Sequence, residues 1–126
     1  MKRISPVVIF LTLWTLLPVA RAQSISDETL ATCAAYYQLL ASTGDLKDIS
    51  SKDSSRAFYA FQKKLPADKD EMVVERMVAM RDEIPGSMTE ASISGFRKKY
   101  DPECKALLFE VWCEAYGKID KNACKR

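Results

Sequence analysis

The sequence predicts an all-α fold, a small disulfide-stapled bundle of four to five short helices. Apolar residues recur every three to four positions through most of the chain, as on one face of a helix. No run of residues alternates between apolar and polar as a half-buried strand does. The chain also carries four cysteines, enough for two disulfides.

The start of the chain has the layout of a cleaved secretory signal. Lys2 and Arg3 precede an apolar run over 7–17, which is followed by the small-residue triplet Ala-Arg-Ala at 20–22. This run is about half of the roughly 20 apolar residues that a membrane span needs, so we expect cleavage and no stable membrane insertion afterwards. Gln23 offers no thiol for a bacterial lipid anchor. A leader that is retained would instead tether the chain to a membrane.

Removal of residues 1–22 leaves residues 23–126, which we expect to form a single helical domain. The leader holds three basic and no acidic side chains, so 16 basic and 17 acidic groups remain of the chain's 19 and 17, and the net charge becomes −1. We therefore expect no nucleic-acid partner. The basic cluster 97–99 has acidic neighbours at Asp101 and Glu103, and we interpret it as a solvated helix face.

Capping and helix-ending residues define the first two helices. Ser26 is placed to cap a helix whose first turn carries two acidic residues, and Gly44 ends that helix. The second helix follows the serine-rich stretch 49–55 and stops at Pro66. The predicted core stripes are Leu30, Cys33, Ala34, Tyr37, Leu40 and Ala41 in the first helix, and Phe58, Phe61 and Leu65 in the second.

The third helix opens in the acidic segment 68–71 and closes at residues 85–86, and a fourth helical pattern follows Thr89. The predicted core stripes are Val73, Met77, Met80 and Ile84, and then Ile93, Phe96 and Tyr100. A neighbouring face of the third helix carries Val74, Val78 and Arg81. Its apolar character suggests that either the fourth helix or a second subunit covers it, so a homodimer through the third helix is one expectation.

The fifth helix has the clearest start, because Asp101 can cap it and Pro102 then occupies the first helical position, where a missing N–H costs nothing. Gly117 is its predicted end. The stripe expected to be buried on this helix consists of Cys104, Leu107, Leu108, Val111 and Ala115.

Helix geometry restricts the pairing of the four cysteines. Cys104 and Cys113 are nine residues apart on one predicted helix, which separates them by roughly 13 Å along the axis. A disulfide needs Cα atoms within about 7 Å, so a continuous helix excludes that pairing. Of the two patterns that remain, we favour Cys33–Cys104 with Cys113–Cys124, because Cys33 and Cys104 both lie on core stripes and Cys124 follows a chain reversal.

The composition argues against catalysis. The chain has no histidine and no CxxC pair, which removes a Ser-His-Asp triad, a Cys-His pair and the usual zinc half-sites. Paired carboxylates such as Glu110 and Glu114 are one turn apart, and we interpret them as a solvent face on which Glu114 also faces Lys118. We therefore expect no enzyme activity and no catalytic, cofactor-binding or metal-binding residues.

Aromatic side chains give the candidate partner-binding residues. Trp112 and Tyr116 lie one turn apart on the last helix, and a Trp/Tyr pair at a partly exposed site is a common binding anchor. Packing against a loop closed by Cys113–Cys124 is the alternative interpretation. Tyr36 and Tyr59 lie at the edge of an aromatic group on the first two helices. This group either forms part of the core or is functional, as the lining of a pocket for an apolar ligand or as a partner-binding surface.

The leader, the size and the cysteines together resemble the small, disulfide-stapled helical proteins of the Gram-negative periplasm, among them chaperones and immunity proteins. Secreted odorant-binding-like carriers remain a second comparison, although their cysteine spacing usually differs from the 70 residues between Cys33 and Cys104. We therefore expect an exported protein, periplasmic or extracellular, that binds another protein as an inhibitor/immunity or accessory/chaperone protein. The alternative is a carrier of a small apolar ligand in a helical cavity.

Overall fold

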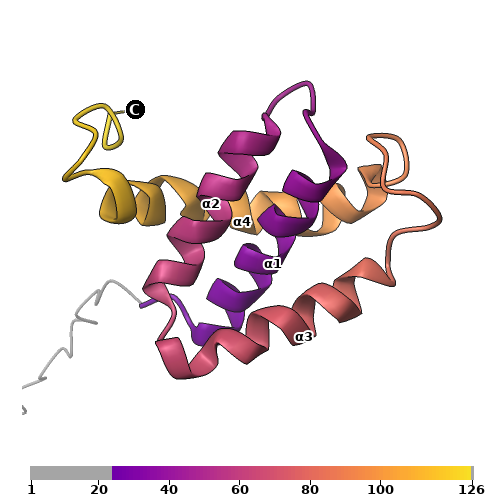
Figure 1. Ribbon diagram of the computed structural model, residues 1–126, viewed down its shortest axis with the longest axis horizontal. Helices are drawn as coiled ribbons and strands as arrows, with labels where there is room; N and C mark the ends of the chain where they lie inside the picture. Colours follow the sequence, from indigo (N-terminus) through magenta and orange to yellow (C-terminus); the bar gives the residue numbers. More distant parts are fainter. Residues whose placement is uncertain (1–23, 126) are drawn as a thin grey trace, which may run out of the picture.

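The computed structural model describes residues 24–125, which form four α-helices and no strand (Figure 1). The helices are α1 (Asp27–Thr43), α2 (Ser51–Lys64), α3 (Asp70–Arg81) and α4 (Ser94–Tyr116), and a 3₁₀ turn, η1 (Ala67–Lys69), precedes α3. The prediction of a small all-α bundle is confirmed. The predicted leader and its cleavage site lie outside the described residues.

Two serine caps set the starts of α1 and α2, which run antiparallel to each other (Figure 1). The Ser26 hydroxyl accepts a hydrogen bond from the backbone N–H of Thr29 at 3.2 Å. Ser50 accepts in the same way from Asp53 at 3.0 Å, so α2 begins inside the serine-rich stretch that we expected to precede it. Gly44 follows α1 with φ of 99°, a conformation that glycine adopts without steric cost.

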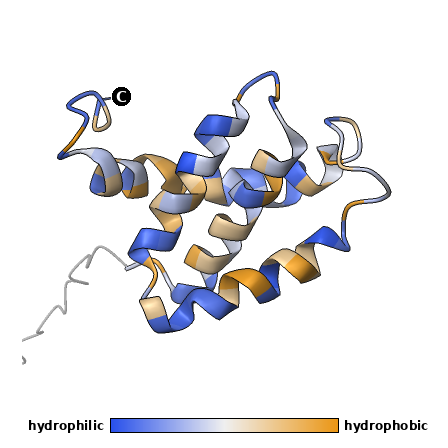
Figure 2. Cartoon of the chain, viewed as in Figure 1, coloured by the Kyte–Doolittle hydropathy of each residue, from blue (hydrophilic) through white to orange (hydrophobic). Residues whose placement is uncertain are grey.

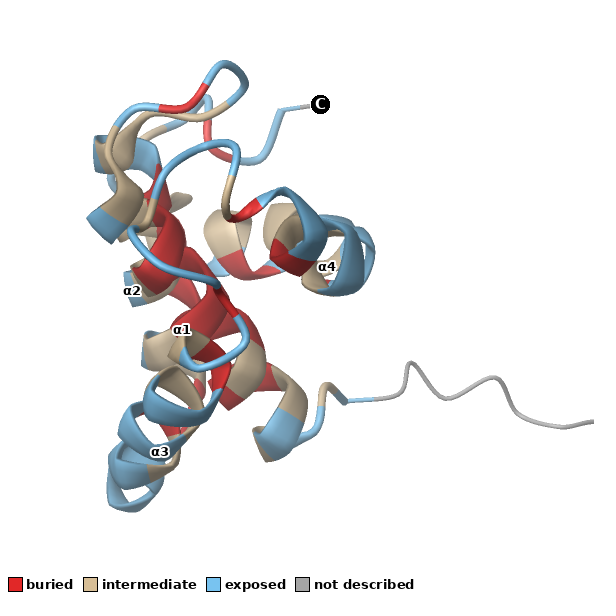
Figure 3. Cartoon of the chain, turned by 90° about the vertical axis from the view of Figure 1, so that its right-hand side faces the viewer, coloured by how far each residue is buried: buried red, intermediate tan, exposed pale blue. Residues whose placement is uncertain are grey.

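The central helix is α1, which packs against α2, α3 and α4. Figure 3 shows the buried residues concentrated where α1 meets the other helices. Contacts on several sides bury more of α1 than the one stripe that its periodicity predicts. The additional buried residues are Ala31, Ala35, Tyr36 and Leu39.

The segment after Thr89 and the predicted fifth helix are one continuous helix, α4, with Pro102 in its interior. The expectation that Asp101 caps a new helix is therefore wrong. Pro102 removes one backbone donor from the helix ladder. The helix continues because tertiary contacts hold both sides of the proline: Arg97 is hydrogen-bonded to Asp48 before it, and Cys104 is bonded to Cys33 after it.

The predicted core stripe of the last helix is only partly buried. Cys104 and Val111 are 1% exposed, whereas Leu107, Leu108 and Ala115 are half-buried. Figure 1 shows that α4 crosses the α1–α2 pair at a steep angle instead of lying along it. A crossing helix is covered mainly where it meets its neighbours, so burial does not extend along the whole stripe.

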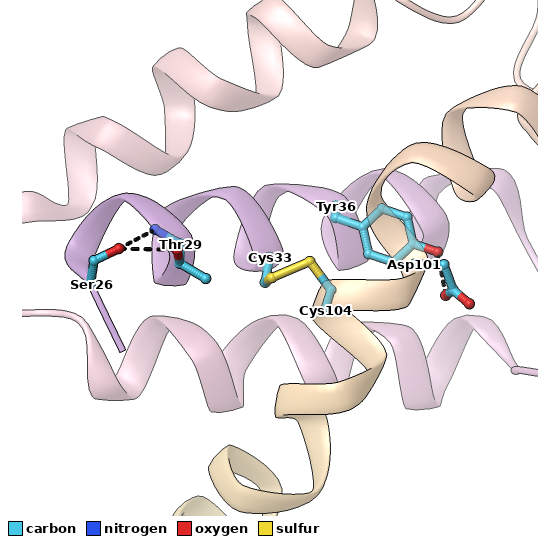
Figure 4. Close-up of a disulfide and its surroundings, with 6 residues drawn as sticks. All are labelled: Ser26, Thr29, Cys33, Tyr36, Asp101 and Cys104. Carbon is cyan, nitrogen blue, oxygen red and sulfur yellow. Dashed lines mark hydrogen bonds between the residues drawn. A yellow bond between two sulfur atoms is a disulfide. The ribbon is translucent and has the colours of Figure 1, made fainter. Parts of the chain in front are cut away.

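Two disulfides fix α4, in the pattern that the sequence favours. Cys33 is bonded to Cys104 with a Cα–Cα distance of 5.2 Å, and both residues are buried (Figure 4). Cys113 is bonded to Cys124 with a Cα–Cα distance of 4.6 Å, and Cys124 is exposed. The first bond therefore joins α1 to α4 inside the core, and the second holds the C-terminal turn against the end of α4.

Hydrophilic and hydrophobic residues are mixed along each helix (Figure 2). Among the described residues, none of the helices combines the length and the apolar composition that crossing a membrane requires.

Candidate functional site

Arg56 of α2 lies against two aromatic rings of α4. Its guanidinium carbon is 4.7 Å from the ring centroids of both Trp112 and Tyr116. The two rings meet edge to face with centroids 4.9 Å apart. The Tyr116 hydroxyl also donates a hydrogen bond of 2.7 Å to the backbone carbonyl of Arg56. We call these three residues, Arg56, Trp112 and Tyr116, the Arg56 cluster.

The Arg56 cluster is half-buried, and its phenol is neutral beside the positive charge of Arg56. Burial raises the pKa of the Tyr116 phenol, while the positive charge of Arg56 acts in the opposite direction. Tyr116 therefore stays neutral and remains a hydrogen-bond donor at physiological pH. Arg56 makes no ion pair with any described residue, and its guanidinium instead lies over the faces of the Trp112 and Tyr116 rings.

The structure brings three of the four predicted partner-binding residues together. Tyr59 follows Arg56 by one turn of α2 and is 60% exposed. Its phenol is close enough to Tyr116 to contribute to the raised pKa of that residue. Tyr36, predicted with Tyr59 at the edge of the aromatic group on the first two helices, is 0% exposed and so belongs to the core and not to an exposed surface. Tyr36 lies at the crossing of α1 and α4, where its ring packs against Phe96 with centroids 5.5 Å apart.

Most of the aromatic group on α1 and α2 is core. Tyr37 and Phe61 stack with ring centroids 5.7 Å apart, and both are buried. Phe58 is half-buried, and its ring centroid lies 5.1 Å from that of the exposed Tyr59. The sequence leaves open whether this group is core or a binding surface, and the core accounts for all of it except Tyr59.

A groove of about 390 Å³ runs between α2 and α4 beside the Arg56 cluster. Its apolar lining comes from Ala60, Val111, Ala115 and Ile119, and its charged lining from Lys63, Lys64, Glu114 and Lys118. Lys64 and Glu114 form an ion pair of 2.6 Å across the groove. The expected pairing of Glu114 with Lys118 is therefore wrong, because a lysine from the neighbouring helix takes the carboxylate.

On the other side of Trp112 lies a second, open groove of about 510 Å³ that the C-terminal turn helps to form. Leu108 and Trp112 contribute from α4, Ile49 from the α1–α2 loop, and Ala123 from the turn. Ala123 is buried, and the Cys113–Cys124 bond holds its segment in place. Trp112 thus contacts Arg56 and also lines a groove that the disulfide loop borders.

A second polar cluster, which the sequence does not predict, lies at the crossing of α1 and α4. Arg97 donates two hydrogen bonds to the carboxylate of Asp48, at 2.8 and 2.6 Å, and a third to the Tyr36 hydroxyl at 3.3 Å. Tyr36 in turn donates to Asp101 at 2.6 Å (Figure 4). The interpretation of 97–99 as a solvated face is therefore wrong for Arg97.

This network shifts the ionisation of its members. Hydrogen bonds from Arg97 lower the pKa of Asp48 below its ordinary value. Burial, with a hydrogen bond to Asp101 as a second cause, raises the pKa of Tyr36. Because the partners lie 49 to 65 positions apart, local sequence patterns could not reveal the network. Its geometry joins α1, the α1–α2 loop and α4, which is a structural role.

The exposed face of α3 is not covered by the rest of the described chain. Val74 is 61% and Val78 is 64% exposed, so the expectation that the following helix covers them is wrong. Arg81 faces the turn after α3, where it donates hydrogen bonds to the carbonyl oxygens of Ile84 and Gly86. What remains on this face is a pair of valines one turn apart.

Within residues 24–125, no group of three acidic or cysteine side chains is arranged to hold a metal ion. Comparison of the chain with protein-family models, curated proteins and solved structures finds no match.

Proposed function

We propose that this is an exported protein that acts without catalysis and binds another protein, as an inhibitor/immunity or accessory/chaperone protein does. The observation that carries the proposal is the Arg56 cluster, with Arg56 between the rings of Trp112 and Tyr116 and with Tyr59 exposed one turn away. Tryptophan, tyrosine and arginine are the residue types enriched among the side chains that dominate protein–protein affinity.

The cluster is also preorganised for binding. Two cation–π contacts and the bond from the Tyr116 hydroxyl to the Arg56 carbonyl hold the three side chains in one arrangement. A partner that docks here loses little side-chain entropy, because the rotamers are already restricted. The exposed Tyr59 extends the surface with a rigid aromatic ring and a hydroxyl that can hydrogen-bond.

Export is supported by the disulfides and by the predicted leader. Disulfides persist in the periplasm and outside the cell, whereas cytosolic thiols are kept reduced. The periplasm or the extracellular space is the compartment that fits both features.

The rival function, transport of a small apolar ligand, has less support. A carrier buries most of its ligand in a largely apolar cavity. The two hollows beside Trp112 and Tyr116 are open to solvent and carry charged side chains, including Lys63 and Glu114 in one and Asp53 and Lys105 in the other.

The test is capture of a native partner by tagged, exported protein followed by native mass spectrometry. We expect a stoichiometric polypeptide that Arg56→Ala and Tyr59→Ala both weaken at unchanged far-ultraviolet circular dichroism. Lys98→Ala is the control, since Lys98 is exposed on α4 and belongs neither to the Arg56 cluster nor to the exposed face of α3. A lipid-like adduct in place of a polypeptide, or capture that neither surface variant affects, would contradict the proposal.

Self-association through α3 is a second partner proposal. The exposed valines lie between acidic residues at the start of α3, Asp70 and Glu71, and Arg81 at its end. Antiparallel pairing about a twofold axis would place Val74 against the second copy's α3 and oppose the charged ends. Sedimentation equilibrium tests this: Val78→Glu should yield only monomer, and a monomeric wild type at high concentration would rule the dimer out.

A further inference from the structure

The floor of the groove between α2 and α4 is apolar and is formed mostly by small side chains. Ala60 and Val111 are buried, and Ala115 is half-buried beside them. Two of the three floor residues are alanines, so the backbone of a ligand can approach the helices closely. A volume of about 390 Å³ within an open trough accommodates several side chains of an extended or helical segment.

The rim of the groove is positively charged. Lys63, near the end of α2, and Lys118, in the turn after α4, are exposed and make no ion pair with the described residues, whereas Lys64 is neutralised by Glu114. Arg56 adds a further unpaired positive charge next to the groove. This concentration of cations contrasts with the net −1 expected for the chain without its leader, so it is a property of this face and not of the whole molecule.

Exposed apolar side chains accompany these charges. Ile119 lines the groove and is 82% exposed, and its N–H is held by the carbonyl of Tyr116 at 3.1 Å. Tyr59, 60% exposed, precedes the floor residue Ala60 on α2. Apolar surface rimmed by charge marks an interaction site.

We propose that this groove binds an acidic, amphipathic segment of a partner protein. The apolar side chains of the segment lie on Ala60, Val111 and Ala115 and against Ile119, and its carboxylates lie near Lys63 and Lys118. Electrostatic complementarity selects an acidic ligand and accelerates its association. This inference rests on the proposed function and specifies the chemistry of the partner.

Fluorescence anisotropy with synthetic peptides tests the inference on the full exported chain with both disulfides formed. The first probe is a labelled helical peptide with leucines at helical spacing and glutamates elsewhere. The second replaces every glutamate by glutamine. We expect the acidic peptide to bind, to bind more weakly as salt increases, and to bind more tightly than the glutamine peptide.

The decisive variant is Lys63→Glu with Lys118→Glu. Its matched control, Lys69→Glu with Lys98→Glu, makes the same change of net charge at exposed positions of η1 and α4 that do not line the groove. We expect about a tenfold loss of affinity for the acidic peptide in the first variant and little change in the second. Equal losses in both variants would show a response to net charge alone and would overturn the proposal.

Two further measurements distinguish a peptide-binding groove from a membrane-binding surface and from partner binding at the Arg56 cluster alone. Vesicles containing anionic phosphatidylglycerol should not compete with the acidic peptide; tight vesicle binding that depends on Lys63 and Lys118, without peptide binding, would overturn the proposal in favour of a membrane surface. In the native capture experiment, a partner lost on Arg56→Ala and retained on Lys63→Glu with Lys118→Glu would leave the proposed function standing and refute the groove. Absence of any polypeptide partner would refute the proposed function itself.

Discussion

Tyr36 of α1 donates a hydrogen bond of 2.6 Å to Asp101 of α4, one turn from the disulfide that joins Cys33 to Cys104 (Figure 4). The crossing of the two helices is thus fixed by a covalent bond and by a charge-assisted hydrogen bond side by side. Tyr36 and Asp101 are 65 positions apart, and Cys33 and Cys104 are 71 positions apart. Each contact therefore closes a long loop of the chain.

Tyr36→Phe should destabilise the fold by about 1.5–3 kcal/mol, because it removes a hydrogen bond to a charged acceptor from a fully buried side chain. Urea unfolding followed by circular dichroism measures the change. Tyr59→Phe is the control, since Tyr59 is exposed, and it should change the unfolding free energy by less than about 0.5 kcal/mol. Similar values for the two variants would show that the bond to Asp101 contributes nothing net.

Alkaline pH should unfold the protein through its buried phenols. Burial raises the pKa values of Tyr36 and Tyr37, whereas in the unfolded chain both phenols titrate near pH 10. Their contribution to stability is therefore complete below about pH 10 and declines as pH rises beyond it. Tyr37→Phe should shift the alkaline transition upward. Phenolate absorbance of these residues should appear only together with loss of helical circular dichroism, and phenolate formation in an intact fold would contradict this.

The loss of stability at acid pH, the acid limb of the curve of unfolding free energy against pH, should depend on Asp48. Hydrogen bonds from Arg97 lower the pKa of Asp48, so its contribution is present above about pH 4 and is lost as pH falls through the folded-state value. The Asp48 side chain is 52% exposed, which limits the effect to about 0.5–1 kcal/mol. Asp48→Asn should lower stability at neutral pH and flatten the acid limb. Asp68→Asn, at an exposed position of η1, should do neither; equal slopes in both variants would exclude Asp48 as a determinant.

The two disulfides should contribute unequally to the free energy of unfolding. Replacing Cys33 and Cys104 by alanine frees a 71-residue separation and should cost about 4 kcal/mol in the chain-entropy model, plus the packing lost at two buried sites. Replacing Cys113 and Cys124 frees a separation of 11 residues and should cost about 3 kcal/mol or less. Thermal unfolding of the two double variants gives the comparison, and a larger loss for the C-terminal pair would contradict it.

Ser54 should tolerate alanine. Its side chain is fully buried, and its hydroxyl has no hydrogen-bond partner among the described residues. Removing an unsatisfied polar group from the core is neutral or stabilising by up to about 1 kcal/mol. Ser50→Ala, four residues earlier, should instead cost about 1 kcal/mol because Ser50 caps α2. Equilibrium unfolding of both variants tests the contrast, and a loss for Ser54→Ala as large as that for Ser50→Ala would contradict it.

The surface is predictable from the sequence only in part. Trp112 and Tyr116 can be identified because a one-turn spacing places two side chains together on a helix, a relation that lies within the local sequence. Arg56 escapes sequence reasoning, because its contact with both rings depends on how α2 meets α4. Helical periodicity places Tyr36 beside the main stripe, at the edge of the aromatic group on the first two helices, but Tyr36 is buried because α4 crosses there.

The sequence by itself determined the all-α class, the start of α1 at Ser26 and its end at Gly44, because caps and breakers act within one turn of the backbone. It also restricted the disulfide pairing, because helix rise sets the distance between cysteines on one helix. Only the tertiary structure decided that α4 continues through Pro102 and that Arg97 is drawn into a network with Tyr36. The reason is physical: propensity and periodicity describe neighbours along the chain, whereas burial and ion pairing depend on which segments a crossing helix meets.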